Sequence, residues 1–325
     1  MTFGIGSSPK TEDIQKYKDI GVKEIYAPFR FDINYFLEGE CKFNENKKKY
    51  YREKIPLWIK QGFKVHIHTE QEGSKSKDNP IPTYLGSDKE SQDTVKRVKA
   101  IIDFMKEVEE DIKKEGKVEG KFGIVEVHCT DENNKFDEST LSNDLKELSK
   151  YGKKFGYDIG IEYGKEKTAF KGKVIEDILD KIGNVKLIFD IGLCYHDYYN
   201  YYKQHNEEEK TEGHLLELEE KAEHDLLQFF KKNVNKICQI HWNNWNTRKR
   251  NGQHRPLFCH GGMISEKTLN KIALKAKEKH IESNLWECYG KLLDNPRMKK
   301  DLVFLQKYFG VNDVRSKNDI PCDNK

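Results

Sequence analysis

The sequence predicts a single-domain (β/α)8 barrel, the TIM-barrel form of the α/β class, in which eight parallel strands alternate with helices. Three observations support this fold. Eight short apolar runs recur along the 325 residues, amphipathic segments of helical period separate them, and the extra length of the chain follows the predicted strands. We expect the barrel to occupy residues 1–315 and a polar C-terminal tail to occupy residues 316–325.

The predicted strands are short runs rich in Ile, Val, Phe and Tyr, as buried parallel strands are. Between them, segments such as TVKRVKAIIDFMKEVEEDIKK (94–114) place their apolar residues on one face of a helix. Several of these segments end at a glycine, namely Gly21, Gly62, Gly156 and Gly183, which is a common helix stop. In chain order the predicted strands are 2–6, 23–29, 64–70, 123–129, 158–164, 186–192, 237–242 and 284–290.

Long insertions follow strands 2, 3, 6 and 7, at 30–50, 70–92, 192–214 and 242–262. Each insertion comes after the C-terminal end of a strand, which is the face where such barrels build their active sites. We expect the loops after strands 3 and 6, with their PIPTYLG and YHDYYNYY segments, to act as lids that exclude water.

Composition excludes several classes of protein. The net charge is only +3, which argues against a polyanion as the main partner. No apolar stretch is long enough to span a membrane, and the N-terminus lacks the pattern of a secretory signal. The seven cysteines are widely spaced and form no Cys-x-x-Cys pair. We therefore expect reduced thiols and a cytoplasmic location.

Ionisable side chains end six consecutive strands. Alternate side chains of a barrel strand point inward, and the last of them reaches the mouth. One charged residue at a strand end is usually salt-bridged or solvated, but a ring of them in phase predicts a functional site. For strands 3 to 8 the last inward residues are His68, His128, Glu162, Asp190, His241 and Glu287, with His66, Glu126 and Gln239 one layer deeper.

A ring of carboxylates and imidazoles in a pocket loses hydration and repels itself unless a cation binds it. Glu162, Asp190, His241 and Glu287 offer three carboxylates and one nitrogen, which suits one Mn²⁺, Co²⁺ or Mg²⁺ ion. Further imidazoles would favour zinc, and more than one ion. The candidates for such extra ligands are His68, His128, His196, His254 and His260.

In its order of motifs the chain resembles the xylose-isomerase-like TIM barrels, a superfamily of sugar isomerases, epimerases, dehydratases and endonuclease IV type abasic-site nucleases. The motifs are IGIEYG with Glu162, LIFDIG with Asp190, CQIHWNN with His241 and NLWECYG with Glu287. The resemblance implies that these four residues bind one divalent metal and that the two glutamates act as acid and base on opposite faces of a sugar.

The chain also departs from the family pattern. The family usually has a histidine three residues after the strand-6 aspartate, where this chain has Leu193, and His196 is the nearest substitute. The nuclease branch also uses histidines on strands 3 and 4, at places comparable to His68 and His128, and His254 falls near its third-zinc loop. That loop lacks the aspartate ligand here, since the segment is GQH. We therefore rank the nuclease second, and nucleic acid is a partner only in that reading.

We expect a metal-dependent sugar isomerase or epimerase in which the metal stabilises an enediolate while Glu162 and Glu287 exchange the proton. A dehydratase with the same chemistry, and a sugar-binding barrel without catalysis, stay open. Family members often pair through their helical faces, which implies a possible homo-oligomer. Trp242 also suits plain packing, and the RKR run at 248–250 also suits a solvated loop. The residues assigned to substrate binding are His68, His128, His196, Trp242 and Arg248.

Overall fold

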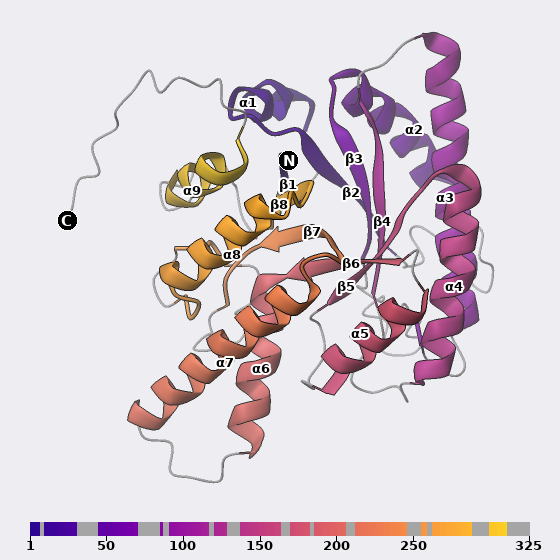
Figure 1. Ribbon diagram of the computed structural model, residues 1–325. Helices are drawn as coiled ribbons and strands as arrows, with labels where there is room; N and C mark the ends of the chain where they lie inside the picture. Colours follow the sequence, from indigo (N-terminus) through magenta and orange to yellow (C-terminus); the bar gives the residue numbers. More distant parts are fainter. Residues whose placement is uncertain are drawn as a thin grey trace.

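Eight parallel strands close into a barrel in the simple order β1 to β8, with the last strand paired to the first (Figure 1). The computed structural model describes residues 1–6, 10–30, 45–70, 85–86, 91–116, 120–128, 137–163, 170–182, 185–205, 212–245, 255–258, 262–287 and 299–310. The strands are β1 Thr2–Ile5, β2 Glu24–Arg30, β3 Lys64–Glu70, β4 Lys121–Val127, β5 Ile159–Tyr163, β6 Val185–Asp190, β7 Ile237–Trp242 and β8 Ser283–Trp286. Each lies within or overlaps a predicted run, so the predicted fold class is confirmed.

Helices cover the outside of the barrel (Figure 1). They are the short η1 Thr11–Asp13, α1 Ile14–Asp19, α2 Glu45–Lys60, α3 Ser91–Glu115, α4 Glu138–Phe155, α5 Phe170–Ile182, α6 Ile191–His205, α7 Glu212–Asn233, α8 Glu266–Glu278 and α9 Lys299–Phe309. Local signals explain their ends. The Asp137 carboxylate accepts a hydrogen bond from the Thr140 amide at the start of α4, and Gly156, at φ +83°, ends that helix in the left-handed region.

The segment 192–214, expected as a loop, is largely helical. Helix α6 begins directly after β6 and runs to His205, so the prediction that YHDYYNYY belongs to a loop is wrong. The reason is the spacing of its buried residues: Ile191, Tyr195 and Tyr199 recur every four positions and form one buried helix face. Helix α6 packs beside α7, and the pair extends outward from the barrel (Figure 1).

The other predicted loops fall mostly in segments that the structure does not describe. These include 31–44, 71–84 and 246–254, and the predicted tail 316–325 with its boundary at 315 also lies outside the described residues. Within the lid predicted after strand 3, only the end of PIPTYLG is described. Leu85 there is buried, and its amide donates to the His128 carbonyl at 3.2 Å.

The barrel interior is polar as well as apolar. Gly160 leaves room for its neighbours, because a Cβ at this position would lie 2.6 Å from the Ile188 side chain.

The middle of the interior holds buried polar side chains at positions where most barrels have branched apolar ones. They are Tyr26, His66, Glu126 and Gln239, each 2% exposed or less.

The floor of the barrel, at the N-terminal ends of the strands, is held by the buried carboxylate of Glu24. It accepts hydrogen bonds from Thr2 and Ser283, and it lies 3.3 Å from both Lys64 Nζ and His66 Nε2. Burial alone raises the pKa of Glu24, but the attraction of His66 and Lys64 and the hydrogen bonds from His66 and Ser283 lower it to about 2. The charge is therefore part of the folded state at neutral pH.

We expect Glu24→Gln to lower the free energy of unfolding at pH 7 by about 3–5 kcal/mol, because the change removes the buried charge that Lys64, His66 and Ser283 contact. The pKa of Glu24 is depressed on folding, so its contribution is present above pH 4.5 and is lost as the pH falls toward 2. The deficit of the variant should accordingly shrink at about pH 3. Urea unfolding at both pH values checks this. The control is Glu278→Gln, whose exposed carboxylate pairs with Lys275; an equal loss in both variants would contradict the account.

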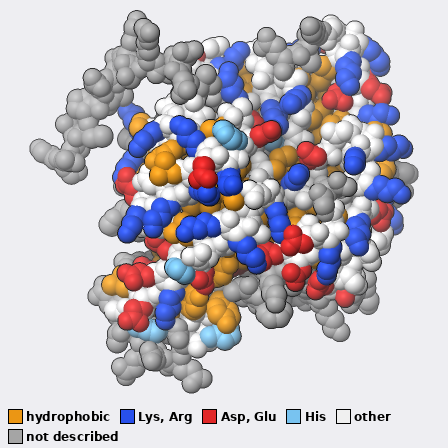
Figure 2. All heavy atoms as spheres, viewed as in Figure 1, with side chains coloured by type: hydrophobic (Ala, Val, Ile, Leu, Met, Phe, Trp, Pro, Cys, Tyr) orange, Lys and Arg blue, Asp and Glu red, His pale blue; other side chains and the backbone are white. Residues whose placement is uncertain are grey.

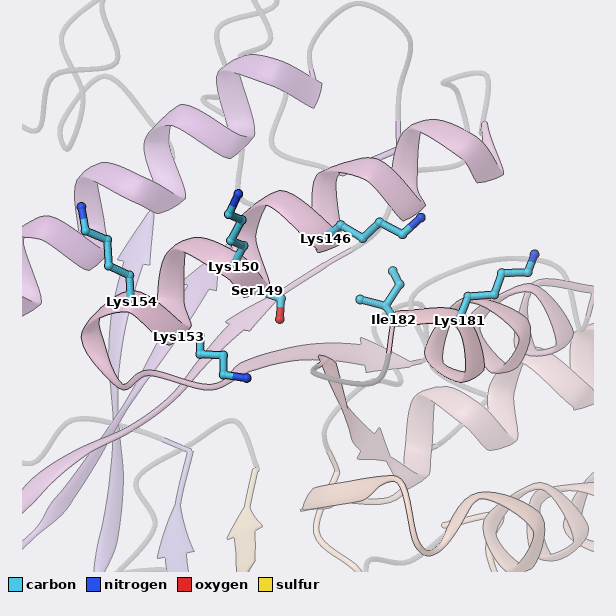
Figure 3. Close-up of a pocket in the computed structure, with 7 residues that line it drawn as sticks. All are labelled: Lys146, Ser149, Lys150, Lys153, Lys154, Lys181 and Ile182. Atoms are coloured by element: carbon cyan, nitrogen blue, oxygen red, sulfur yellow. The ribbon is translucent and has the colours of Figure 1, made fainter.

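Charges of both signs cover the surface. On the face shown in Figure 2, basic and acidic side chains are interspersed with small hydrophobic patches. A hollow of about 360 Å³ between α4 and α5 is bordered by five lysines (Figure 3). Lys150 and Lys153 extend in opposite directions from α4, so the lysines do not converge on one ligand. Among the described helices, none combines the length and the apolar character needed to cross a membrane.

Candidate metal centre

The side chains of Glu162, Asp190, His241 and Glu287 meet at the C-terminal ends of β5 to β8. Each offers one ligand atom, and the four atoms all lie within 4.8 Å of one another. His241 is at the centre: its Nδ1 lies 2.9 Å from Glu162 Oε1, 3.0 Å from Glu287 Oε2 and 3.8 Å from Asp190 Oδ2. The register explains the convergence, because Asp190 pairs with His241 across β6 and β7. The proposed ligands are thus brought together.

Asp190 is oriented by groups that the sequence alone did not reveal. Its Oδ1 accepts from the Leu193 amide at 2.6 Å, and its Oδ2 accepts from Asn243 Nδ2 at 2.7 Å. The Asn243 amide oxygen in turn accepts from the Gly192 amide at 3.0 Å. A Cβ at Gly192 would lie 2.0 Å from that oxygen, so only glycine allows this contact. Leu193 therefore orients the Asp190 carboxylate through its backbone amide.

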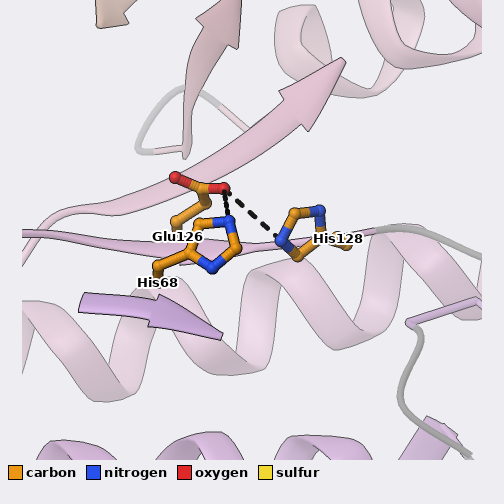
Figure 4. Close-up of side chains that lie close together, drawn as sticks. All are labelled: His68, Glu126 and His128. Carbon is orange, nitrogen blue, oxygen red and sulfur yellow. Dashed lines mark ion pairs between the residues drawn. The ribbon is translucent and has the colours of Figure 1, made fainter. Parts of the chain in front are cut away.

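A second group of potential ligands lies beside the first, formed by His68, Glu126 and His128 (Figure 4). Glu126 Oε1 lies 3.0 Å from His68 Nε2 and 3.4 Å from His128 Nε2. Glu162 connects the two groups, because its Oε1 faces His241 while its Oε2 lies 2.9 Å from His128 Nδ1. Glu126, predicted to lie one layer deeper than the ligands, is thus itself within reach of a cation.

The charges in the centre depend on one another. Burial raises the pKa of Glu162, but His128 and His241 outweigh it and hold that pKa well below its usual range. Burial lowers the pKa of His241, but Glu287 and Glu126 outweigh it and hold that pKa well above its usual range. Without a cation, a proton on His241 therefore offsets part of the carboxylate charge.

A divalent cation fits this donor set. Glu162, Asp190 and His241 are 5% exposed or less, so two carboxylates and an imidazole share a space that water hardly enters, with the Glu287 carboxylate at its edge. In the second group, Glu126 Oε1 and His128 Nε2 are buried atoms 3.4 Å apart, so a cation can be reached by both. Oxygen-rich ligands suit Mn²⁺, Co²⁺ or Mg²⁺ in the first group, and the two imidazoles of the second suit zinc.

Metal binding at the second group should strengthen with pH. Burial lowers the pKa of His68, but Glu126, Glu287 and Glu162 outweigh it and raise it to about 9. A cation must displace this proton, so the apparent Zn²⁺ affinity should rise by up to about tenfold per pH unit as the pH approaches 9. Calorimetry in two buffers of different ionisation enthalpy measures the proton released. An affinity that is constant from about pH 6.5 to 9 would contradict this expectation.

The structure places other predicted residues elsewhere. Trp242 follows His241 and faces outward, where its ring packs on Phe304 and Phe309 of α9 at centroid distances of 5.7 and 5.3 Å. Its assignment to substrate binding is therefore wrong. His196 lies on α6 rather than in a loop, stacked on Trp245 at 3.8 Å, and within the described residues it belongs to neither ligand group. Arg248, His254 and His260 lie outside the described residues.

Tyr26 of β2 is a functional candidate that the sequence reading missed. Its hydroxyl contacts Glu126 of the second group and His241 of the first. Burial and the nearby carboxylates raise its pKa well above 10, so the phenol stays protonated. The strand alternation that identified His68 also predicts Tyr26 to face the interior, because Glu24 and Tyr26 are two residues apart in KEIYAPF and share one face of the strand.

Comparisons with solved structures show the same fold at low sequence identity. A D-tagatose 3-epimerase-like protein matches with 14% identity and a TM-score of 0.55, over 95% of this chain and 97% of that one. A xylose isomerase-like TIM barrel protein from Mycobacterium smegmatis, in complex with magnesium, matches with 10% identity and a TM-score of 0.52, over 92% and 87%. An AP endonuclease of family 2 from Brucella melitensis matches with 9% identity and a TM-score of 0.51, over 95% and 99%.

No family model and no curated protein matches the chain. The likeness to solved structures therefore shows the fold alone, an eight-stranded barrel that the chain shares with these proteins. What the chain does must be argued from its own side chains.

Proposed function

We propose that this protein is a divalent-metal-dependent isomerase or epimerase of a sugar or a sugar-derived carbonyl compound. The observation that carries the proposal is the convergence of Glu162, Asp190, His241 and Glu287 at the barrel mouth. The epimerase-like and magnesium-bound barrels of the same fold agree with it. A bound cation would polarise the substrate carbonyl and stabilise the enediolate formed on proton loss.

Glu162 and Glu287 are the proposed acid–base pair. They come from β5 and β8, three strands apart in an eight-stranded barrel, so they approach the shared space from different sides. Inverting a stereocentre needs proton removal on one face and delivery on the other, which two such carboxylates supply. The Glu287 side chain is 15% exposed, whereas Glu162 is almost enclosed, so Glu287 is the one that exchanges its proton with solvent more readily.

We propose that His68 and His128 hold substrate hydroxyls if the second group binds no cation. His68 is 16% exposed, at the edge of the centre, and both rings lie against Glu126. Of the residues predicted to bind substrate, these two lie at the centre. A homo-oligomer and a cytoplasmic location stay predictions, and light scattering on the purified protein tests the first.

Solvent deuterium incorporation tests the proposed reaction. The metal-loaded protein is incubated in D2O with a panel of ketoses, aldoses and their phosphates, and each sugar is analysed by NMR. We expect exchange at the carbon next to the carbonyl of at least one sugar, abolished by chelation. A protein that binds metal but exchanges no hydrogen across the panel would contradict proton-transfer chemistry.

A metal-dependent nuclease of abasic-site DNA is the second candidate, and one observation favours it. The two oxygens of Glu162 face His241 and His128 separately, so one carboxylate is placed to serve a cation in each group. Two adjacent cations commonly stabilise the attacking oxygen and the leaving oxygen in phosphodiester hydrolysis. Two or three zinc ions per chain, with cleavage of duplex DNA at an abasic site, would favour this function over the isomerase.

A further inference from the structure

The hydroxyl of Tyr26 lies between the two ligand groups. Tyr26 is 2% exposed, and its oxygen contacts Glu126 Oε2, His241 Nε2 and, at 2.7 Å, Gln239 Oε1. Its ring packs edge-on against His66 and His241, with centroids 6.0 and 5.6 Å away. The side chain is therefore fixed both by packing and by polar contacts.

The direction of these hydrogen bonds follows from the number of protons. A phenol has one proton to donate, and it faces two acceptors, the Glu126 carboxylate and the Gln239 amide oxygen. The charged carboxylate is the stronger acceptor, so Tyr26 donates to Glu126. The Tyr26 oxygen then accepts from Nε2–H of His241. Gln239 is oriented independently, because its Nε2 donates to Ser283 Oγ at 2.8 Å and leaves its oxygen facing Tyr26.

This direction matters because the other nitrogen of His241 faces the cation site. Nδ1 lies 2.9 Å from Glu162 and 3.0 Å from Glu287. A neutral imidazole that offers Nδ1 as a ligand carries its proton on Nε2, and a fixed acceptor for that proton holds the ring in the binding orientation. Of the acceptors in the centre, the Tyr26 oxygen lies nearest to His241 Nε2. The Gln239 Oε1 atom lies 3.2 Å from this nitrogen, and Glu126 Oε2 lies 3.5 Å from it.

We propose that Tyr26 is a positioning residue: anchored by Glu126, it holds Nε2–H of His241 so that Nδ1 faces the cation, and it thereby couples the two ligand groups. The inference rests on the proposed metal centre. It makes Glu126, a member of one group, an indirect determinant of metal affinity in the other.

Tyr26→Phe removes the hydroxyl and keeps the ring. We expect the Mn²⁺ affinity of the purified full-length protein to fall about 10- to 100-fold, the usual effect of losing a partner that orients a metal ligand. The visible absorption spectrum of bound Co²⁺ should change as well, because it reports the ligand geometry. The matched control is Tyr195→Phe, which removes a buried hydroxyl that makes no hydrogen bond among the described residues. This control should leave both readouts unchanged.

The double variant Tyr26→Phe with Glu126→Gln tests the coupling. If Glu126 acts on His241 through Tyr26, the double variant binds Mn²⁺ about as weakly as Tyr26→Phe alone. Two results would overturn the proposal. One is a Tyr26→Phe variant whose Mn²⁺ affinity falls less than about twofold below that of a metal-binding wild type. The other is a double variant in which the free-energy losses of the two single variants add. If circular dichroism shows that Tyr26→Phe is unfolded, the single variant Glu126→Gln tests the proposal instead. An unchanged Mn²⁺ affinity in Glu126→Gln would then contradict it. A wild-type protein that binds no metal would instead contradict the proposed function.

Discussion

Glu162→Gln should reduce turnover at least about 10³-fold, the largest effect of any single change in this protein. The glutamine keeps the shape of the side chain but has neither the charge nor the basicity of the carboxylate. Glu162 also faces His241 with one oxygen and His128 with the other, both at 2.9 Å, so the change weakens both ligand groups at once. Hydrogen exchange into the substrate identified in D2O, together with metal content, measures the loss.

A control separates this effect from a loss of stability. Glu176 is also a buried glutamate, 7% exposed, but it lies on α5 and pairs with Lys232 and Asn233 away from the centre. Glu176→Gln should lower stability without changing the turnover of the folded fraction. Glu162→Gln protein that retains more than about a tenth of the wild-type turnover would show that this carboxylate is not the acid or base.

Asp190→Asn should weaken Mn²⁺ binding at least about 100-fold, more than the loss of an orienting partner, because it removes a charged ligand itself. The amide still offers an oxygen to the Leu193 amide, so the local turn into α6 is retained. A ligand present at 100 times its Kd stabilises the folded state by about 2.7 kcal/mol. We expect Mn²⁺ to raise the Tm of the wild type by this effect and to leave the Tm of the variant nearly unchanged.

The second ligand group gives a comparison within the same molecule. Because Asp190 belongs to the first group only, Zn²⁺ binding at His68, Glu126 and His128 should survive Asp190→Asn. Equal losses of Mn²⁺ and Zn²⁺ in this variant would mean that the two groups form one indivisible site. An unchanged Mn²⁺ affinity would remove Asp190 from the set of ligands.

The inward side chains of the strands were predictable because they follow from one geometric rule. In a strand the side chains alternate, so the parity of an apolar run fixes which residues face the interior. This rule placed Glu162, Asp190, His241 and Glu287 together although 125 positions separate the first from the last. It also explains the error at Trp242: the residue next to His241 must face the helices, whatever its chemistry would suit.

Other features depended on information that strand parity does not contain. Helix α6 was expected as a loop because its aromatic run, from Tyr195 to Tyr202, was read by composition rather than by its four-residue spacing. The roles of Asn243 and Gly192 depend on a contact between two chain segments 51 residues apart, which no local pattern reveals. Tyr26 differs from these features, because strand parity does place it in the interior; its polar role is hidden only because a tyrosine in an apolar run resembles ordinary core.

The central claim is that four side chains from β5 to β8 bind one shared divalent cation. A crystal of the protein grown with Mn²⁺, measured near the manganese absorption edge, tests it most directly. We expect an anomalous peak enclosed by Glu162, Asp190, His241 and Glu287, at about 2.0–2.3 Å from their nearest oxygen and nitrogen atoms. A fully soaked crystal with no peak between these residues, or with the four side chains turned away from one another, would contradict the account.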